Sequence, residues 1–304
     1  MKYDNGANQD IIFYAQRNAL RNAQEAMVMS KFTDKKSLPK YYGHQYKVHY
    51  WQHIPTTEVK TLAEGVTPAS TDLVRVSLTG SINRQGLWTP VTDEFQEMFE
   101  NSPEFNKEAS TELGYSLGSK LDSDAIEVAI AGAGTQFDLA VDFGGDIDEA
   151  LKAIRKALRK ANAPKITKVK TGSTKVGTKP VAGGWYIICS VDDADTFRGA
   201  TDFLPVEDYS YSDGILENEI GVIKSLGLRI VESMNAASGN CVAVAEGALG
   251  EVSLAGSKNI EYIIKSLGSE GSSDPLDQRG SVGVKSRAGV FVMRAEYLVA
   301  LKLN

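Results

Sequence analysis

Three histidines, His44, His49 and His53, cluster within ten residues and are the first candidates for metal chemistry. They border or lie in an aromatic and β-branched run, YKVHYWQHI, which predicts a strand. Strand residues four positions apart are separated by about 13 Å, because each residue advances the chain by about 3.3 Å. His44 also falls on the opposite face from the other two. We therefore expect solvent-facing histidines and no metal site.

A second candidate is the run GSTKVGTK at residues 172–179, which resembles a phosphate-binding loop. That pattern requires Gly-Lys followed by Ser or Thr, whereas here Thr precedes Lys. Pro180 and two glycines follow the run, so no helix N-terminus is expected there to hold a phosphate. A basic surface loop is the better interpretation, and a nucleotide-dependent enzyme is the remote alternative.

The remaining nucleophiles and acids give no catalytic constellation. Cys189 and Cys241 each lie in an apolar, strand-like run, which predicts buried thiols and no disulfide framework. Asp274 and Asp277 flank Pro275 without a histidine or cysteine nearby in the sequence. We therefore predict that the chain is not an enzyme and uses no cofactor.

Composition limits the remaining function classes. The chain has 304 residues, 42% hydrophobic and 24% charged, which are ordinary values for a globular protein with a sizeable core. The net charge of −6 argues against a dedicated nucleic-acid binder, because phosphate contacts need a basic surface. The sequence has neither a signal-peptide pattern nor an apolar run of membrane-spanning length, so we expect no export and no membrane partner.

The longest predicted element is a helix over residues 103–131, ended by Gly132 and Gly134. Apolar residues recur along it every three or four positions. These are Phe105, Ala109, Leu113, Leu117, Leu121, Ala125 and Val128. Gly114 and Gly118 also lie within it, and each costs about 1 kcal/mol relative to alanine. We expect another segment to cross closely over these glycines, and we call the helix the spine helix.

Two further helices are predicted. Residues 147–161 carry an apolar stripe after the cap Asp146, with basic residues on the outer face; a solvated surface is expected there, and phosphate or partner contact is the alternative. Residues 9–29 form an alanine-rich amphipathic helix with little apolar area. It can lie on a neighbouring subunit or on its own core, and the sequence favours neither.

Alternation predicts strands at residues 46–54 and 73–88, joined by a polar connection at 54–73 that contains Pro55 and Pro68. A connection of that length within a compact domain is uncommon and usually functional. The simplest geometry is a two-stranded ribbon with a projecting tip. Since an isolated ribbon is marginal in water, we expect it to rest on a neighbouring subunit.

The second half alternates strands and helices, which predicts a mixed α/β domain at about 141–256. Within it, 184–191 is a strand, a short helix begins at Asp192 or Asp193 and runs to Phe203, and strands follow at 227–232 and 241–249. Residues 259–267 form a further strand. The apolar tail at 290–303 is expected to return to the sheet along the spine helix.

Residues 260–288 carry the motif that resembles a known family. In IEYIIKSLGSEGSSDPLDQRGSVGVKS, the Asp-Pro-Leu-x-Gln-Arg segment and the following Val-Gly-x-Lys strand are similar to major capsid proteins of tailed bacteriophages. The branch is that of the short-tailed coliphage with a very large virion RNA polymerase. Asp277 stands where Asn is more usual. The LAEGVTP run at 62–68, Asn162-Ala163-Pro164 and residues 221–232 also resemble that family.

The resemblance implies an α+β fold, the tailed-phage major capsid fold. It comprises an N-terminal arm (1–43), a strand ribbon with an extended loop (44–91, tip 54–73) and a peripheral domain with the spine helix and a long sheet (92–140). An axial α/β domain (141–256) and a return to the peripheral domain (257–304) complete it. Encapsulin nanocompartment shells share that fold and are the alternative.

The implied function is a coat protein that self-assembles into hexamers and pentamers of an icosahedral head around double-stranded DNA. Implied partners are the chain itself, a portal protein, scaffolding or decoration proteins, and DNA contacted non-specifically. The implied location is the virion, after assembly in the host cytoplasm. Six residues are predicted to contact other subunits: Glu58, Lys60, Leu62, Glu64, Asp274 and Arg279.

Overall fold

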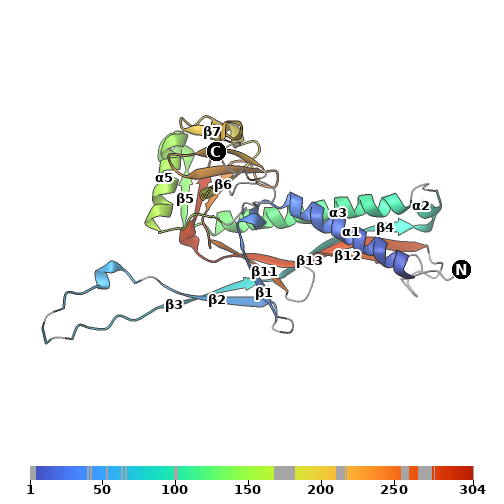
Figure 1. Cartoon of the computed structure of the whole chain (residues 1–304), viewed down its shortest axis with the longest axis horizontal. Helices are drawn as coiled ribbons and strands as arrows, with labels where there is room; N and C mark the ends of the chain where they lie inside the picture. The colour runs from blue at the N-terminus through green and yellow to red at the C-terminus, as the bar shows by residue number, and fades with distance from the viewer. Residues whose placement is uncertain are drawn as a thin grey trace, which may run out of the picture.

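The computed structural model describes most of the chain, in an elongated shape with a globular head (Figure 1). The described residues are 5–39, 41, 43–52, 54–62, 64–65, 67–98, 102–167, 182–209, 216, 218–254, 260–265, 276 and 278–303. Among them, no helix is both long enough and apolar enough to cross a membrane. Helices and sheets are both extensive, which confirms the α+β class.

The spine helix is confirmed as α3 (Ser102–Ala131), lying along a five-stranded sheet in the described residues (Figure 1). That sheet has the order β1 (Asp34–Leu38), β11 (Leu249–Leu254), β13 (Arg279–Val292) and β12 (Ile260–Lys265), with β4 (Asn83–Thr92) also paired to β13. Leu113 and Leu117 are buried against Val282 and Val284. The predicted stripe therefore packs on the sheet, although the side chain of Phe105 lies outside the described residues.

The two glycines of α3 are crossed by α1 (Asn5–Ala26). A Cβ at Gly114 would lie 2.5 Å from the carbonyl oxygen of Ala19, and one at Gly118 would lie 2.5 Å from that of Ala23. Both alanines are fully buried. The expected close approach is confirmed, and its partner is the N-terminal helix of the same chain, which resolves the choice that the sequence left open.

A buried carboxylate joins α1, α3 and the head. Asp122 of α3 is 1% exposed, and its Oδ1 accepts hydrogen bonds from the backbone N–H groups of Val28 and Met29 at 2.9 and 2.7 Å. Its Oδ2 accepts from Ser233 Oγ and Asn235 Nδ2, both at 3.0 Å. The turn between α1 and the short helix η1 (Met29–Lys31) is thereby fixed to the spine.

The predicted strand at 73–88 is in fact two strands. β3 (Arg75–Ser81) pairs with β2 (Gln45–Trp51), whereas β4 pairs with β13. The chain changes partner at Ile82, whose N–H donates to the carbonyl of His44. The two halves of the predicted strand therefore belong to different sheets. β2 and β3 form a separate two-stranded sheet, whereas β4 lies in the sheet along the spine helix.

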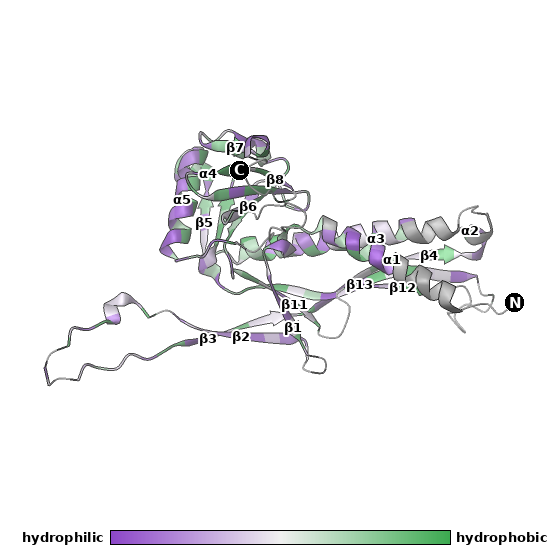
Figure 2. Cartoon of the chain, viewed as in Figure 1, coloured by the Kyte–Doolittle hydropathy of each residue, from purple (hydrophilic) through white to green (hydrophobic). Residues whose placement is uncertain are grey.

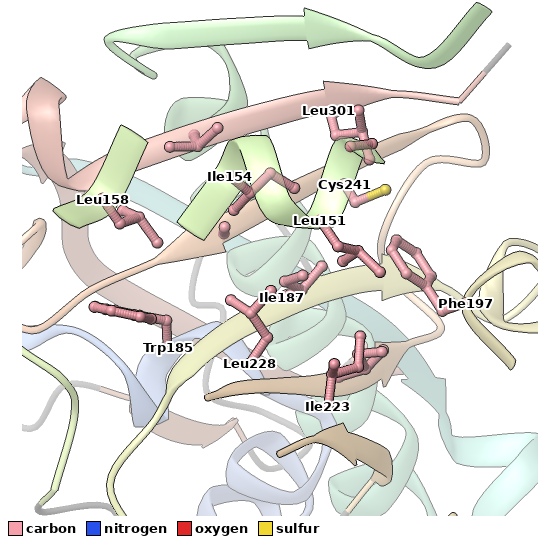
Figure 3. Packing of buried hydrophobic residues seen from close by; sticks show 14 of the residues in the cluster. Leu151, Ile154, Leu158, Trp185, Ile187, Phe197, Ile223, Leu228, Cys241 and Leu301 are labelled. Carbon is pink, nitrogen blue, oxygen red and sulfur yellow. The ribbon is translucent and has the colours of Figure 1, made fainter. Parts of the chain in front are cut away.

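The head is a seven-stranded sheet in the described residues, with α4 (Leu139–Phe143) and α5 (Ile147–Lys160) beside it (Figure 1). Its order is β5 (Thr135–Asp138), β14 (Leu298–Lys302), β10 (Asn240–Val244), β6 (Trp185–Ser190), β9 (Leu228–Ser233), β8 (Glu219–Ile223) and β7 (Phe203–Pro205). Figure 3 shows Leu151, Ile154 and Leu158 of α5 directed at the strands. The predicted cap is confirmed, since Asp146 accepts from the N–H groups of Asp148 and Glu149.

Two predictions about the head need correction. The helix expected from Asp192 or Asp193 to Phe203 is only α6 (Ala194–Arg198), and Phe203 begins β7. The tail was expected to return entirely to the sheet along the spine. Only β13 lies there, because β14 follows the turn η4 (Ala295–Tyr297) into the head and pairs with β10 and β5.

The head also contains a buried ion pair that the sequence did not indicate. Arg229 Nη1 lies 2.6 Å from Glu219 Oε1, and the two side chains are 4% and 0% exposed. Tyr209, at the end of α7 (Val206–Tyr209), donates to the same oxygen, and the N–H of Leu216 donates to Oε2. Burial and the neighbouring Glu219 charge raise the pKa of Tyr209, so its hydroxyl remains a donor.

Candidate assembly surfaces

The two cysteines, which are the candidate nucleophiles of the sequence, are not reactive in the structure. Cys189 and Cys241 are both buried, as predicted. Burial raises the pKa of Cys189 to about 12 and also raises that of Cys241, so neither thiol forms the reactive thiolate at neutral pH. Asp277 and the glycine-rich run at 172–179 lie outside the described residues.

His44 and His49 are exposed at and within β2, and His53 lies outside the described residues. His49 Nδ1 is 2.8 Å from Ser77 Oγ, a cross-strand partner in the β2–β3 register. In the described part of the chain, no three His, Cys, Asp or Glu side chains are grouped to hold a metal ion.

The extended loop projects from the body beyond β2 and β3 (Figure 1). Just beyond β2 and β3, the N–H of Gln52 donates a hydrogen bond to the carbonyl oxygen of Val74, with N and O 2.9 Å apart. The short helix η2 (Thr56–Glu58) follows in the segment that leaves β2. Four predicted contact residues, Glu58, Lys60, Leu62 and Glu64, are exposed on this loop. Val59 and Leu62 are 80% and 73% exposed, and Ile54, Leu73 and Val74 are exposed as well. Apolar side chains thus recur along a loop that its own chain does not cover.

The root of the ribbon is anchored by Phe291 of β13. A Cβ at Gly80 would lie 2.5 Å from the Phe291 ring, and one at Gly250 would lie 2.7 Å from it. Tyr46 lies against the same ring, with centroids 6.3 Å apart. Two glycines thus let one aromatic ring fill the junction between the ribbon and the sheet, which fixes the root and leaves the tip exposed.

The other predicted contact residues lie elsewhere. Arg279 begins β13 and is paired in register with Thr92, where β4 meets α2 (Asp93–Met98). That is the opposite end of the molecule from the loop tip (Figure 1). Asp274 lies outside the described residues. Within one subunit the loop residues and Arg279 therefore do not form a single site.

A groove lies on the five-stranded sheet beside β4, at a surface that the sequence patterns above do not predict. Trp88 of β4 is 68% exposed and faces away from α3. It lies beside Gly283, and together with Gly86 and Ile263 these residues line a groove of about 510 Å³. A tryptophan two residues after a glycine in a strand is the sequence signal that could have revealed it.

A pocket between α3 and the sheet beside it is small, about 80 Å³. It is lined by Gln85, Asp122, Asp124 and Glu251, among others. Glu251 accepts from Ser30 Oγ and Thr33 Oγ1, and Asp124 accepts from Gln85 Nε2, so these carboxylates serve as hydrogen-bond acceptors within the fold. Ligand pockets usually exceed about 300 Å³, so a substrate site is not indicated here.

Residues 75–300 match the family model for the phage capsid protein. The chain belongs to the phage capsid protein family. The match spans β3 to β14 and so includes the spine helix, the peripheral sheet and the head. Together with its structural likeness to phage capsids, it identifies the chain as a major capsid protein of the tailed-phage type, located in the virion capsid.

The fold is shared with several solved shells. The capsid of cyanophage P-SCSP1u aligns with a TM-score of 0.62 at 12% identity, covering 91% of this chain and 88% of that one. Mycobacterium phage Che8 aligns with a TM-score of 0.58 at 16% identity and 90% coverage of both chains. The SrpI encapsulin of Synechococcus elongatus aligns at 0.56 and 8% identity, covering 90% of this chain and 86% of that one. A comparison with curated protein sequences found no match.

Proposed function

We propose that this capsid protein forms hexamers and pentamers that close into an icosahedral head around double-stranded DNA. Each subunit meets the next through two different surfaces, a heterologous contact that closes into a ring when the rotation permits. Shell formation requires no bond to be made or broken, so the subunit acts as a structural protein and not as an enzyme.

The observation that carries this proposal is the extended loop. It exposes Val59 and Leu62 almost fully, although its root is packed tightly around Phe291. Exposed apolar side chains on a polar loop with a rigid root are expected where a partner covers them. We infer that this partner is a neighbouring subunit. Its groove beside Trp88 has a volume of about 510 Å³ and exposes apolar surface that the loop side chains can cover.

The predicted contact residues fit this arrangement. Glu58, Lys60, Leu62 and Glu64 would lie across the neighbour, while Asp274 and Arg279 would contact a further subunit at the far end of the peripheral domain. Because the loop residues and Arg279 lie at opposite ends of the molecule, each subunit can both donate its loop and receive another. We assign the N-terminal arm (1–43), ribbon, peripheral, axial and return segments as the sequence predicts, except that β5 and β14 join the head sheet and β1 and β11 join the sheet along the spine helix.

The other partners follow from the same assignment. A portal protein would replace one ring, and scaffolding or decoration proteins would act on the assembled surface in the host cytoplasm. DNA inside the head would be contacted weakly and without sequence preference, consistent with the net charge of −6.

Electron microscopy of the purified protein tests the proposal. Rings, tubes or shells are expected, and a protein that remains a small monomer at high concentration would overturn it. The content of particles purified from producing cells distinguishes a phage head from an encapsulin shell. Nuclease-protected DNA supports the phage head, whereas particles filled with protein would favour the encapsulin alternative.

A further inference from the structure

The outer face of α5 is strongly basic. From Leu151 to Lys160 the helix carries five basic residues and no acidic one, whereas Leu151, Ile154 and Leu158 are buried in the head. Figure 2 shows hydrophilic residues on α5 and hydrophobic ones in the strands beside it. Arg159 lies over the Trp185 ring at 5.6 Å, so part of this charge packs on its own chain. Lys156 and Lys160 are exposed near the end of the helix.

These two lysines border a groove between α5 and the edge of the sheet. The groove has a volume of about 590 Å³ and is lined by Thr135 and Phe137 of β5 together with Lys156 and Lys160, and Glu296 is the acidic residue in its lining. β5 pairs only with β14 among the described strands, so its outer edge faces the groove side of the head. The groove thus combines an apolar ring, an open strand edge and positive charge.

The opposite edge of the same sheet is acidic. Strand order places β5 at one edge and β7 at the other. The segment around β7, which we call the acidic rim, has five exposed acidic residues: Asp192, Asp195, Asp202, Glu207 and Asp208. Between Asp192 and Asp208 the one basic residue is Arg198, which is paired with Asp195 at 2.9 Å. Lys224, after β8, lies beside the rim with its Nζ 5.8 Å from the centre of the Tyr209 ring, so the five acidic residues still outnumber the basic ones. The two edges of the head therefore carry opposite charge.

We propose that the groove bordered by Lys156 and Lys160 receives the acidic rim of a second copy of the chain, next to it in the ring. This inference rests on the ring assembly proposed above and names two head surfaces through which neighbouring subunits would meet. Opposite edges with opposite charge allow every subunit to use both faces, as a closed heterologous ring requires. Exposed charges add little affinity each, but they fix orientation and exclude wrong pairings.

Duplex DNA is the competing occupant of the basic groove, because phosphates also bind lysine. DNA would use the groove alone and would leave the acidic rim without a role. A second copy uses both edges, and its acidic residues are on the partner surface itself. The charge pattern of the whole head therefore favours a subunit contact.

Charge reversal tests this contact. The groove variant is Lys156→Glu with Lys160→Glu, and the rim variant is Asp202→Lys with Asp208→Lys. Each alone brings like charges together, so the yield of rings is expected to fall at least about tenfold with unchanged thermal unfolding. A control with Arg17→Glu and Lys35→Glu, which are exposed and distant in sequence from both edges, should assemble like the wild type.

Combining the variants makes the test specific. One chain carrying all four substitutions should again form hexamers and pentamers. An equal mixture of groove and rim chains should form only rings with an even number of subunits, because alternation fails in a pentamer. Hexamers without pentamers, seen by electron microscopy and native mass spectrometry, would match the pairing.

Other results of these experiments would contradict either the contact between groove and rim or the ring assembly itself. If either single-face variant assembles normally, or if the four-fold variant does not recover, the pairing is wrong and ring assembly still stands. If the groove variant forms normal rings but loses salt-dependent binding of a 30-base-pair duplex, the groove is a DNA contact. A wild type that forms no rings would overturn the proposed function and this contact together.

Discussion

All six residues of β6 in the head are buried, whereas the loop beyond β2 and β3 exposes Val59 and Leu62 almost fully. In the head, Glu219 has three hydrogen-bond donors around it and α5 closes one face of the sheet. On the loop, aliphatic side chains lie without cover from their own chain. The difference indicates that the body supplies the stability of the subunit, and that the loop is free to serve contacts between subunits.

The largest expected effect is loss of the buried ion pair. Glu219→Ala leaves the Arg229 guanidinium buried without its carboxylate, and should lower the free energy of unfolding by about 3–5 kcal/mol. Chemical denaturation of the isolated subunit measures this. The matched control is Asp195→Ala, which breaks an exposed pair and should change stability by less than about 1 kcal/mol. Equal effects of the two variants would contradict the comparison.

A smaller effect is expected where α1 crosses the spine. Gly118→Ala would place a Cβ 2.5 Å from the carbonyl oxygen of Ala23, so steric conflict should outweigh the gain in helix propensity of about 1 kcal/mol. A net loss of about 1–3 kcal/mol is expected in denaturant unfolding. Ser116→Ala, at an exposed position of the same helix, should be neutral or slightly stabilising. A stabilised Gly118→Ala variant would show that α1 does not lie on this face.

The smallest effect on stability is expected on the loop. Val59→Ser with Leu62→Ser removes only exposed apolar surface, so the free energy of unfolding should change by less than about 0.5 kcal/mol. Assembly should fall sharply, as light scattering at increasing concentration would record. Lys47→Ser, on the exposed strand β2, is the matched control and should assemble normally. Unimpaired assembly of the double variant would remove these two side chains from the contact.

Local pattern predicted the long helices better than the short helix α6, whose extent it overestimated. The apolar stripe from Ile147 to Leu158 and the Asp146 cap predicted α5 correctly, because spacing and capping depend only on residues close together in the sequence. The glycines of α3 predicted a close crossing for the same reason. The crossing partner could not be predicted, because an alanine-rich helix has few features that distinguish one supporting surface from another.

Pairing between distant segments was harder. Alternation continues through Ile82, so residues 73–88 resemble one strand even though β3 and β4 have different partners. Leu298–Lys302 is apolar enough for either sheet, and only the turn at η4 directs it into the head. The network of Asp122 and the pair of Glu219 with Arg229 depend on contacts across the fold that spacing does not encode. The loop residues were recognisable as contact candidates from their family resemblance, and their role remains a prediction.

Deletion of residues 56–70 tests most directly whether the loop serves assembly while the body supplies the stability of the subunit. The deleted and full-length proteins would be compared by thermal unfolding and by electron microscopy of the assembled product. We predict that the deleted subunit unfolds cooperatively at the temperature of the full-length subunit and forms no closed shells. Closed shells of normal size from the deleted protein would contradict the account.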